Sequence, residues 1–146
     1  MKKIAILISA AMMIALVACE KEEESTYEDG TYRAETAEFS HGWKNFLEVT
    51  IADDEQTSVN FDAVNEEDDT FFKSEATAEQ YPMDPHPSVW IPQIEAQLMA
   101  VDITSYEGID GISGATSASN DAEALFDLIL EAAKTGDTST QILPAE

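Results

Sequence analysis

The sequence is short of cysteine, histidine and basic residues, and each shortage excludes a class of site. Cysteine occurs once, as Cys19, so no disulfide can form within the chain. The two histidines, His41 and His86, give a transition-metal site little support. Seven Lys and Arg residues stand against thirty Asp and Glu residues, for a formal charge of −23. A surface this acidic repels phosphate backbones, which excludes nucleic acid as a partner.

Long apolar runs are also missing, apart from one near the start of the chain. Two lysines follow the initial Met, and residues 4–18 form an apolar and small-residue stretch that ends directly before Cys19. About fifteen residues have signal-peptide proportions and are too few for a permanent membrane-spanning helix. The ending Leu16-Val17-Ala18-Cys19 resembles a bacterial lipobox. That resemblance implies cleavage before Cys19 and attachment of a diacylglycerol, with acyl chains such as palmitate, to its thiol. An ordinary signal peptide or an N-terminal membrane helix with an incidental cysteine is the alternative.

The length allows one folded domain, and composition suggests its limits. Removal of residues 1–18 takes away two lysines and no acid, which changes the formal charge from −23 to −25. Residues 19–29 follow as the lipidated cysteine and an acidic stretch with little to bury, which predicts a flexible tether. We expect the domain itself to span residues 30–136, and residues 137–146 to form a flexible tail.

The first half of the domain has the pattern of a small sheet. Apolar and polar residues alternate over residues 31–36, 43–51 and 58–63, which predicts strands with one buried face. The polar cluster at residues 53–56 predicts a hairpin connection between the second and third strands. An antiparallel meander is the simplest arrangement.

The second half has helical patterns. Residues 70–80 fit a helix, prolines 82, 85 and 87 enforce a loop, and residues 88–100 fit a second helix with Ser88 as its cap and Pro92 in its first turn. The strongest pattern spans residues 117–134, where an apolar stripe faces a row of acidic residues. The predicted fold class is therefore α+β: a small, mainly antiparallel sheet packed by two or three helices.

The stretch that precedes the last predicted helix has the composition of an anion site. It reads Asp110-Gly111-Ile112-Ser113-Gly114-Ala115-Thr116-Ser117-Ala118-Ser119. Small side chains allow close backbone approach, and the first N–H groups of a helix lack partners within it. The hydroxyl groups of Ser113, Thr116, Ser117 and Ser119 could add donors. On composition alone, a plain connection with a helix cap is the alternative.

The order of residues 110–116 closely resembles the flavinylation motif of the FMN-binding domain family. That family includes the flavin-carrying C and G subunits of sodium-pumping quinone reductases and Rnf complexes, and small extracytoplasmic lipoproteins. In it, the last threonine of the motif is joined to the FMN phosphate through a phosphoester by a separate magnesium-dependent flavin transferase that uses FAD. The resemblance implies that Thr116 is the acceptor, that Asp110, Ser113, Gly114 and Ala115 are the motif positions before it, and that Ser117 is the hydroxyl residue after it.

Other segments extend the resemblance over residues 29–136. Residues 29–32 match the opening of the small lipoprotein members, and residues 42–44 with the strand that follows also resemble them, as does the last helix. The resemblance implies a flavoprotein held at the extracytoplasmic face of the cell membrane. Such a protein relays electrons between a membrane oxidoreductase and another carrier or an external acceptor, so it is an electron-transfer protein more than a substrate-turning enzyme. The alternatives are a non-redox surface lipoprotein, a binding module or antigen without flavin, and a noncovalent FMN protein.

Several aromatic residues could flank a flavin ring. His41 and Trp43 precede the second predicted strand, and Tyr81, His86 and Trp90 surround the proline loop. For each one we expect the commoner outcome, a surface histidine or a core aromatic residue. No catalytic residue is predicted, because Ser113 and Ser117 lack a recognisable nucleophile elbow. No metal ligand is predicted, because two histidines and no free cysteine give a transition-metal site little support.

Overall fold

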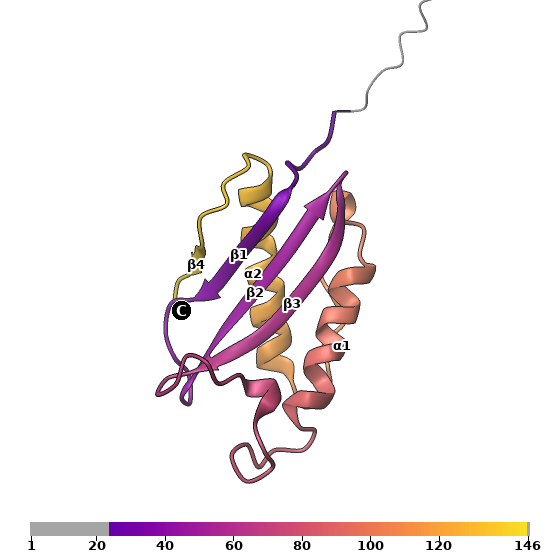
Figure 1. Cartoon of the computed structure of the whole chain (residues 1–146). Helices are drawn as coiled ribbons and strands as arrows, with labels where there is room; N and C mark the ends of the chain where they lie inside the picture. The colour runs from indigo at the N-terminus through magenta and orange to yellow at the C-terminus, as the bar shows by residue number, and fades with distance from the viewer. Residues whose placement is uncertain (1–23, 146) are drawn as a thin grey trace, which may run out of the picture.

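The computed structural model describes residues 24–145, which fold into a mixed sheet with helices on one face (Figure 1). The predicted signal peptide, Cys19 and the first part of the predicted tether lie outside the described residues. Within residues 24–145, none of the helices has the length and apolar character needed to cross a bilayer. The α+β class and the mainly antiparallel sheet predicted from the sequence are confirmed.

The sheet has the strand order β3-β2-β1-β4. Its first three strands are β1 (Gly30–Thr36), β2 (Trp43–Ala52) and β3 (Glu55–Asn65), paired antiparallel as a meander. The predicted alternation is confirmed for one face, on which Tyr32, Ala34, Leu47, Val49 and Phe61 are fully buried. On the opposite face, which was predicted to be wet, the paired residues Phe46 and Asp62 are buried as well. The β2–β3 connection is shorter than predicted. Asp53 and Asp54 take φ values of +52° and +58°, which a tight two-residue turn requires.

The chain enters the sheet at the end that holds this Asp53–Asp54 turn. The N–H groups of Thr26 and Tyr27 donate to the Asp54 carboxylate over 2.9 and 2.8 Å. The Tyr27 ring is buried, and its hydroxyl donates to the carbonyl of Ile103 over 2.9 Å. Residues 26–29, predicted as the end of a flexible tether, are therefore part of the folded domain, because one aromatic side chain and one turn carboxylate fix them.

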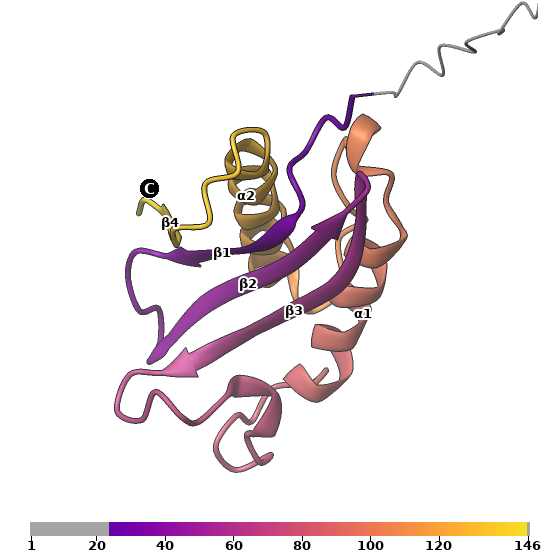
Figure 2. The ribbon, with the colours of Figure 1, turned by 45° about the horizontal axis from the view of Figure 1, so that its top comes forward.

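Two helices cover the buried face of the sheet (Figure 2). They are α1 (Pro87–Ala100) and α2 (Thr116–Ala133), with a short 3₁₀ turn, η2 (Ile103–Ser105), between them. The apolar stripe predicted for the last helix is buried, with Leu128 only half-buried. In α1 the cap is His86 rather than the predicted Ser88, since the Ser88 N–H donates to His86 Nδ1 over 3.2 Å. Pro92 lies in the second turn rather than the first.

The helix predicted for residues 70–80 is reduced to a single 3₁₀ turn, η1 (Lys73–Glu75). The two phenylalanines before it pack in different places: Phe71 lies 5.5 Å from Trp43 and Phe72 lies 6.0 Å from Phe46, between ring centroids. The Phe71 carbonyl also accepts the N–H of Asn65 at the end of β3 over 3.0 Å. This pairing with β3 competes with helical hydrogen bonds, so the helical prediction was wrong here.

The C-terminal stretch predicted as a flexible tail, residues 137–146, contains a fourth strand. Strand β4 (Gln141–Leu143) runs parallel to β1 and pairs with residues 34–36. The N–H of Ala37 extends this pairing by donating to the Leu143 carbonyl over 2.8 Å. The open edge of β1 thus orders a segment that has little apolar content of its own.

Candidate functional site

The loop predicted to carry the chemistry leads directly into α2. Thr116 is the first helical residue, and the cap position before it is Ala115, whose side chain makes no capping hydrogen bond. A methyl group cannot accept the N–H groups of the first turn, which a Ser, Thr, Asp or Asn cap would satisfy. Thr116 and Ser117 are exposed. The helix therefore presents unsatisfied donors and two accessible hydroxyl groups at the same end.

Two contacts hold this loop in shape. Gly114 has φ +82°, and a Cβ atom built there would lie 2.4 Å from Cδ of Pro85. The buried Ser119 hydroxyl accepts the Ile112 N–H over 3.2 Å and donates to the Ala115 carbonyl over 2.9 Å. Ser119 therefore fixes the loop from inside, instead of adding the ligand donor that the sequence suggested.

A cavity of about 720 Å³, here called the motif cleft, opens at this point. Gly114–Ala118 form one part of its lining, and the aromatic residues Trp43, Tyr81 and Trp90 form another. Trp43 begins β2 and is 8 % exposed, while Trp90 lies in α1 and is 4 % exposed. The cleft thus combines a helix N-terminus with a group of aromatic rings that come from distant parts of the chain.

The predicted site residues divide into two groups. Gly114, Ala115, Thr116 and Ser117 line the motif cleft, whereas Asp110 and Ser113 are exposed and do not line it. The backbone N–H of Asp110 is held by the side-chain oxygen of Gln97 in α1, over 2.7 Å.

The aromatic candidates divide in the same way. His41, Trp43, Tyr81 and Trp90 line the motif cleft, while His86 does not and instead caps α1. We expected each of them to have an ordinary structural position. In the structure, four of the five also line the motif cleft.

Lys73, which the sequence did not indicate as a site residue, also lines the motif cleft. Its side chain is 9 % exposed, and its Nζ lies 5.6, 5.5 and 6.0 Å from the ring centroids of Trp43, Tyr81 and Trp90. Burial lowers the pKa of Lys73, and the more distant carboxylates of Asp62 and Asp121 oppose this in part. A lysine directly after two phenylalanines is the one local sign of burial, and it gives no link to Thr116.

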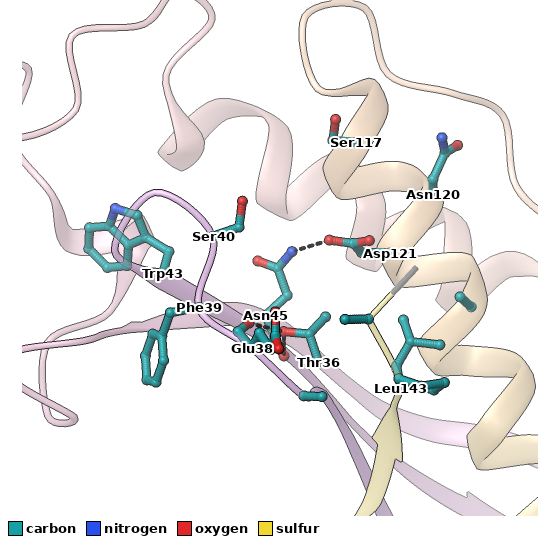
Figure 3. A pocket seen from close by; sticks show the side chains of 14 residues that line it. Thr36, Glu38, Phe39, Ser40, Trp43, Asn45, Ser117, Asn120, Asp121 and Leu143 are labelled. Atoms are coloured by element: carbon teal, nitrogen blue, oxygen red, sulfur yellow. Dashed lines mark hydrogen bonds between the residues drawn. The ribbon is translucent and has the colours of Figure 1, made fainter.

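A second hollow of about 570 Å³ adjoins the motif cleft (Figure 3). Asn45 of β2 points toward Asp121 of α2, and its Nδ2 donates to that carboxylate over 2.6 Å. Asn45, Asp121, Trp43 and Ser117 line both cavities. The Asn45–Asp121 hydrogen bond therefore fixes the start of β2 against the first turns of α2, between the motif cleft and the second hollow.

No family model matches the sequence, and no curated protein matches it. Among solved structures, the crystal structure of the CPE2226 protein from Clostridium perfringens matches with 30 % identity and a TM-score of 0.73, over 82 % of this chain and 99 % of that chain. A solution structure from Clostridium thermocellum matches with 20 % identity and a TM-score of 0.43, over 77 % of this chain and 94 % of that one. By its identity and coverage of the first of these, the chain belongs to the same family as the CPE2226 protein of Clostridium perfringens.

Proposed function

We propose that the chain carries FMN, joined through its phosphate to Thr116, and serves as an electron carrier held at the extracytoplasmic face of the cell membrane by a lipid on Cys19. The observation that carries the proposal is the position of Thr116. The residue that the motif resemblance names as acceptor is the first residue of an uncapped helix, and it lines a cleft that also contains three aromatic rings.

The phosphate fits the start of α2 for physical reasons. Backbone N–H groups without a cap, together with the helix dipole, favour negative charge at this end. Ala115 gives these groups no competing acceptor. Thr116 is exposed, so its hydroxyl is accessible to a modifying flavin transferase. A phosphoester bond would keep an anionic group on a protein whose formal charge, −25 after removal of residues 1–18, otherwise repels it.

The aromatic part of the motif cleft suits a planar ring. Ligand cavities of about 300–1,000 Å³ with mainly apolar and aromatic linings are typical of cofactor sites, and the motif cleft has about 720 Å³. Trp43, Tyr81 and Trp90 supply flat apolar surfaces for stacking. FMN, when bound, supplies one- and two-electron redox chemistry, while the protein supplies position and electrostatics.

The test is to coexpress residues 20–146 with a flavin transferase, export the product, and examine a denaturing gel under ultraviolet light. Thr116→Ala and Ser117→Ala are compared, because the two hydroxyl groups are neighbours in the same turn and both line the cleft. We expect a fluorescent band for the wild type and Ser117→Ala, and none for Thr116→Ala. Circular dichroism of each variant checks that folding is unchanged.

The other outcomes separate the alternatives. A dark wild-type band, with a known carrier labelled in the same cells, would contradict covalent attachment. A native protein that is yellow but loses its colour on denaturation would support noncovalent FMN. A protein colourless under both conditions would favour a non-redox surface lipoprotein that keeps the fold without flavin.

A further inference from the structure

Lys73 is the basic residue whose position the fold does not account for. Within residues 24–145, Arg33, Lys44 and Lys134 each lie within 4 Å of a carboxylate, at distances from 2.5 to 3.9 Å. Lys73 forms no such pair in that part of the chain, although it is the most buried of the four. A buried ammonium group without a counter-ion is costly, so its presence in a cleft wall calls for an explanation.

The nearest carboxylates are committed to other partners. Asp62 accepts hydrogen bonds from the N–H groups of Ala63 and Ser74 and from the Ser74 hydroxyl. Asp121 accepts the side-chain N–H of Asn45. Their charges act on Lys73 from a distance, but burial dominates and lowers its pKa. Among residues 24–145, Lys73 therefore has no carboxylate within 4 Å, and the carboxylate of Asp121 in the same cleft lining is hydrogen-bonded to Asn45.

Lys73 lies at the aromatic end of the motif cleft. Its Nζ is within about 6 Å of the rings of Trp43, Tyr81 and Trp90, at the outer limit of cation–π attraction. A planar ligand that packs against these rings comes within reach of the ammonium group. The start of α2, with its own donors, serves the phosphate at Thr116. The two positive features of the cleft thus suit two different parts of one ligand.

We propose that Lys73 contacts the isoalloxazine ring in the motif cleft, where its ammonium group offsets the negative charge that the ring gains on reduction. This rests on the proposed function above. Uptake of two electrons from a partner protein with one proton from water leaves the ring with one more negative charge than before. A fixed positive charge beside the ring stabilises the reduced state more than the oxidised state, and so raises the midpoint potential.

The proposal also makes an expectation about the stability of the flavin-free domain. Because Lys73 is charged and unpaired without ligand, its replacement by an apolar residue should not weaken the fold. A residue kept for structure would show the reverse. A residue that lowers the stability of the fold while it serves a binding site is typical of functional positions.

The experiment compares Lys73→Met with Lys44→Met in the flavin-loaded protein. Lys44 is paired with Glu35 over 2.9 Å and does not line the motif cleft, so it controls for the loss of one positive charge from an acidic protein. Three quantities are measured: flavin label per chain, midpoint potential by spectroscopic titration with dithionite, and unfolding temperature of the flavin-free domain. The same quantities are measured for the wild type and for Lys73→Arg, which keeps the charge.

We expect Lys73→Met to take up as much flavin label as the wild type. Its equilibrium should favour the oxidised flavin at least tenfold more than in the wild type, which lowers the midpoint potential by about 30 mV for a two-electron couple. Lys44→Met and Lys73→Arg should stay well within that shift. The flavin-free Lys73→Met domain should unfold at the wild-type temperature or above it.

Each other result overturns part of the reasoning. An unlabelled wild type removes the proposed function and this inference with it. A labelled Lys73→Met with the potential of Lys44→Met removes this inference alone. Loss of label only in Lys73→Met would assign the lysine to the phosphate and attachment instead of the ring. Failure of Lys73→Met to fold, or an equal shift in Lys73→Arg, would contradict the electrostatic role.

Discussion

Gly114→Ala is the substitution by which a single methyl group should disturb the candidate site most. Gly114 has φ +82°, and an added Cβ would lie 2.4 Å from Cδ and 2.9 Å from Cγ of Pro85. The left-handed conformation costs an alanine roughly 1–2 kcal/mol. Relief of an overpacked contact typically costs about 1–3 kcal/mol more. The expected loss of unfolding free energy is therefore on the order of 2–5 kcal/mol.

A loss of this size is easily measured. For a domain between about 100 and 150 residues, 1 kcal/mol corresponds to a change of roughly 3–5 °C in the unfolding temperature, so Gly114→Ala should lower it by on the order of 10 °C. Circular dichroism of flavin-free residues 20–146 provides the assay, which makes the result independent of any cofactor. Strain at Gly114 can also relax by movement of the loop, which would displace Thr116 and reduce flavin labelling.

Gly111→Ala is the matched control, three residues earlier in the same loop. No atom lies within 4 Å of a Cβ built at Gly111, and its φ is not positive. An alanine at a compatible glycine position commonly stabilises a protein by about 0.4–1 kcal/mol, because the unfolded chain loses freedom. If Gly114→Ala unfolds within about 2 °C of Gly111→Ala, the contact with Pro85 and the assigned loop conformation are both refuted.

Two further predictions concern buried polar groups. The Tyr106 hydroxyl is buried without a hydrogen-bond partner in residues 24–145, so Tyr106→Phe should raise the free energy of unfolding by about 1 kcal/mol in a denaturant titration; a loss of that size would contradict the assigned environment. Burial raises the pKa of Glu95 in the folded state, although the Phe61 N–H donates to its carboxylate over 3.0 Å. The ionised form therefore costs stability, a cost that is absent below the unfolded pKa of about 4.3 and appears as the pH rises through the folded pKa. Glu95→Gln, which keeps an acceptor for Phe61, should be more stable than the wild type at pH 7 and equal to it below pH 4; lower stability at pH 7 would show that the carboxylate charge is favourable there.

Local patterns were enough to predict the elements that carry their own signal. The strands around Tyr32, Leu47 and Phe61 alternate with period two, and the last helix has an uninterrupted apolar stripe, so each element specifies its buried face. The loop before Thr116 is predictable for the same reason. Its small residues and the helix that follows lie next to one another in the chain.

Features that depend on partners far away in the chain could not be predicted in this way. Strand β4 forms because β1 offers a free edge, and residues 70–80 fail to form a helix because Phe71 and Phe72 pack on separate aromatic residues. In the site, Lys73 and Trp90 meet only after the sheet and α1 have packed together. No spacing in the sequence connects them with Thr116, so the charge and the rings of the motif cleft emerge from the fold.

The two ends of the sheet have different consequences for how partners approach the molecule. The chain enters beside the Asp53–Asp54 turn, whereas β2 and α2, whose first residues are Trp43 and Thr116, both begin at the opposite end (Figure 1). The ten residues of β2 run between these ends and span about 33 Å at 3.3 Å per residue. If a lipid on Cys19 anchors the protein, the chain joins that anchor at the end of the sheet that lies opposite the cleft. An acceptor free in solution could then reach the cleft from the side away from the anchor, while a donor within the same membrane could meet it only when the predicted tether lets the domain turn.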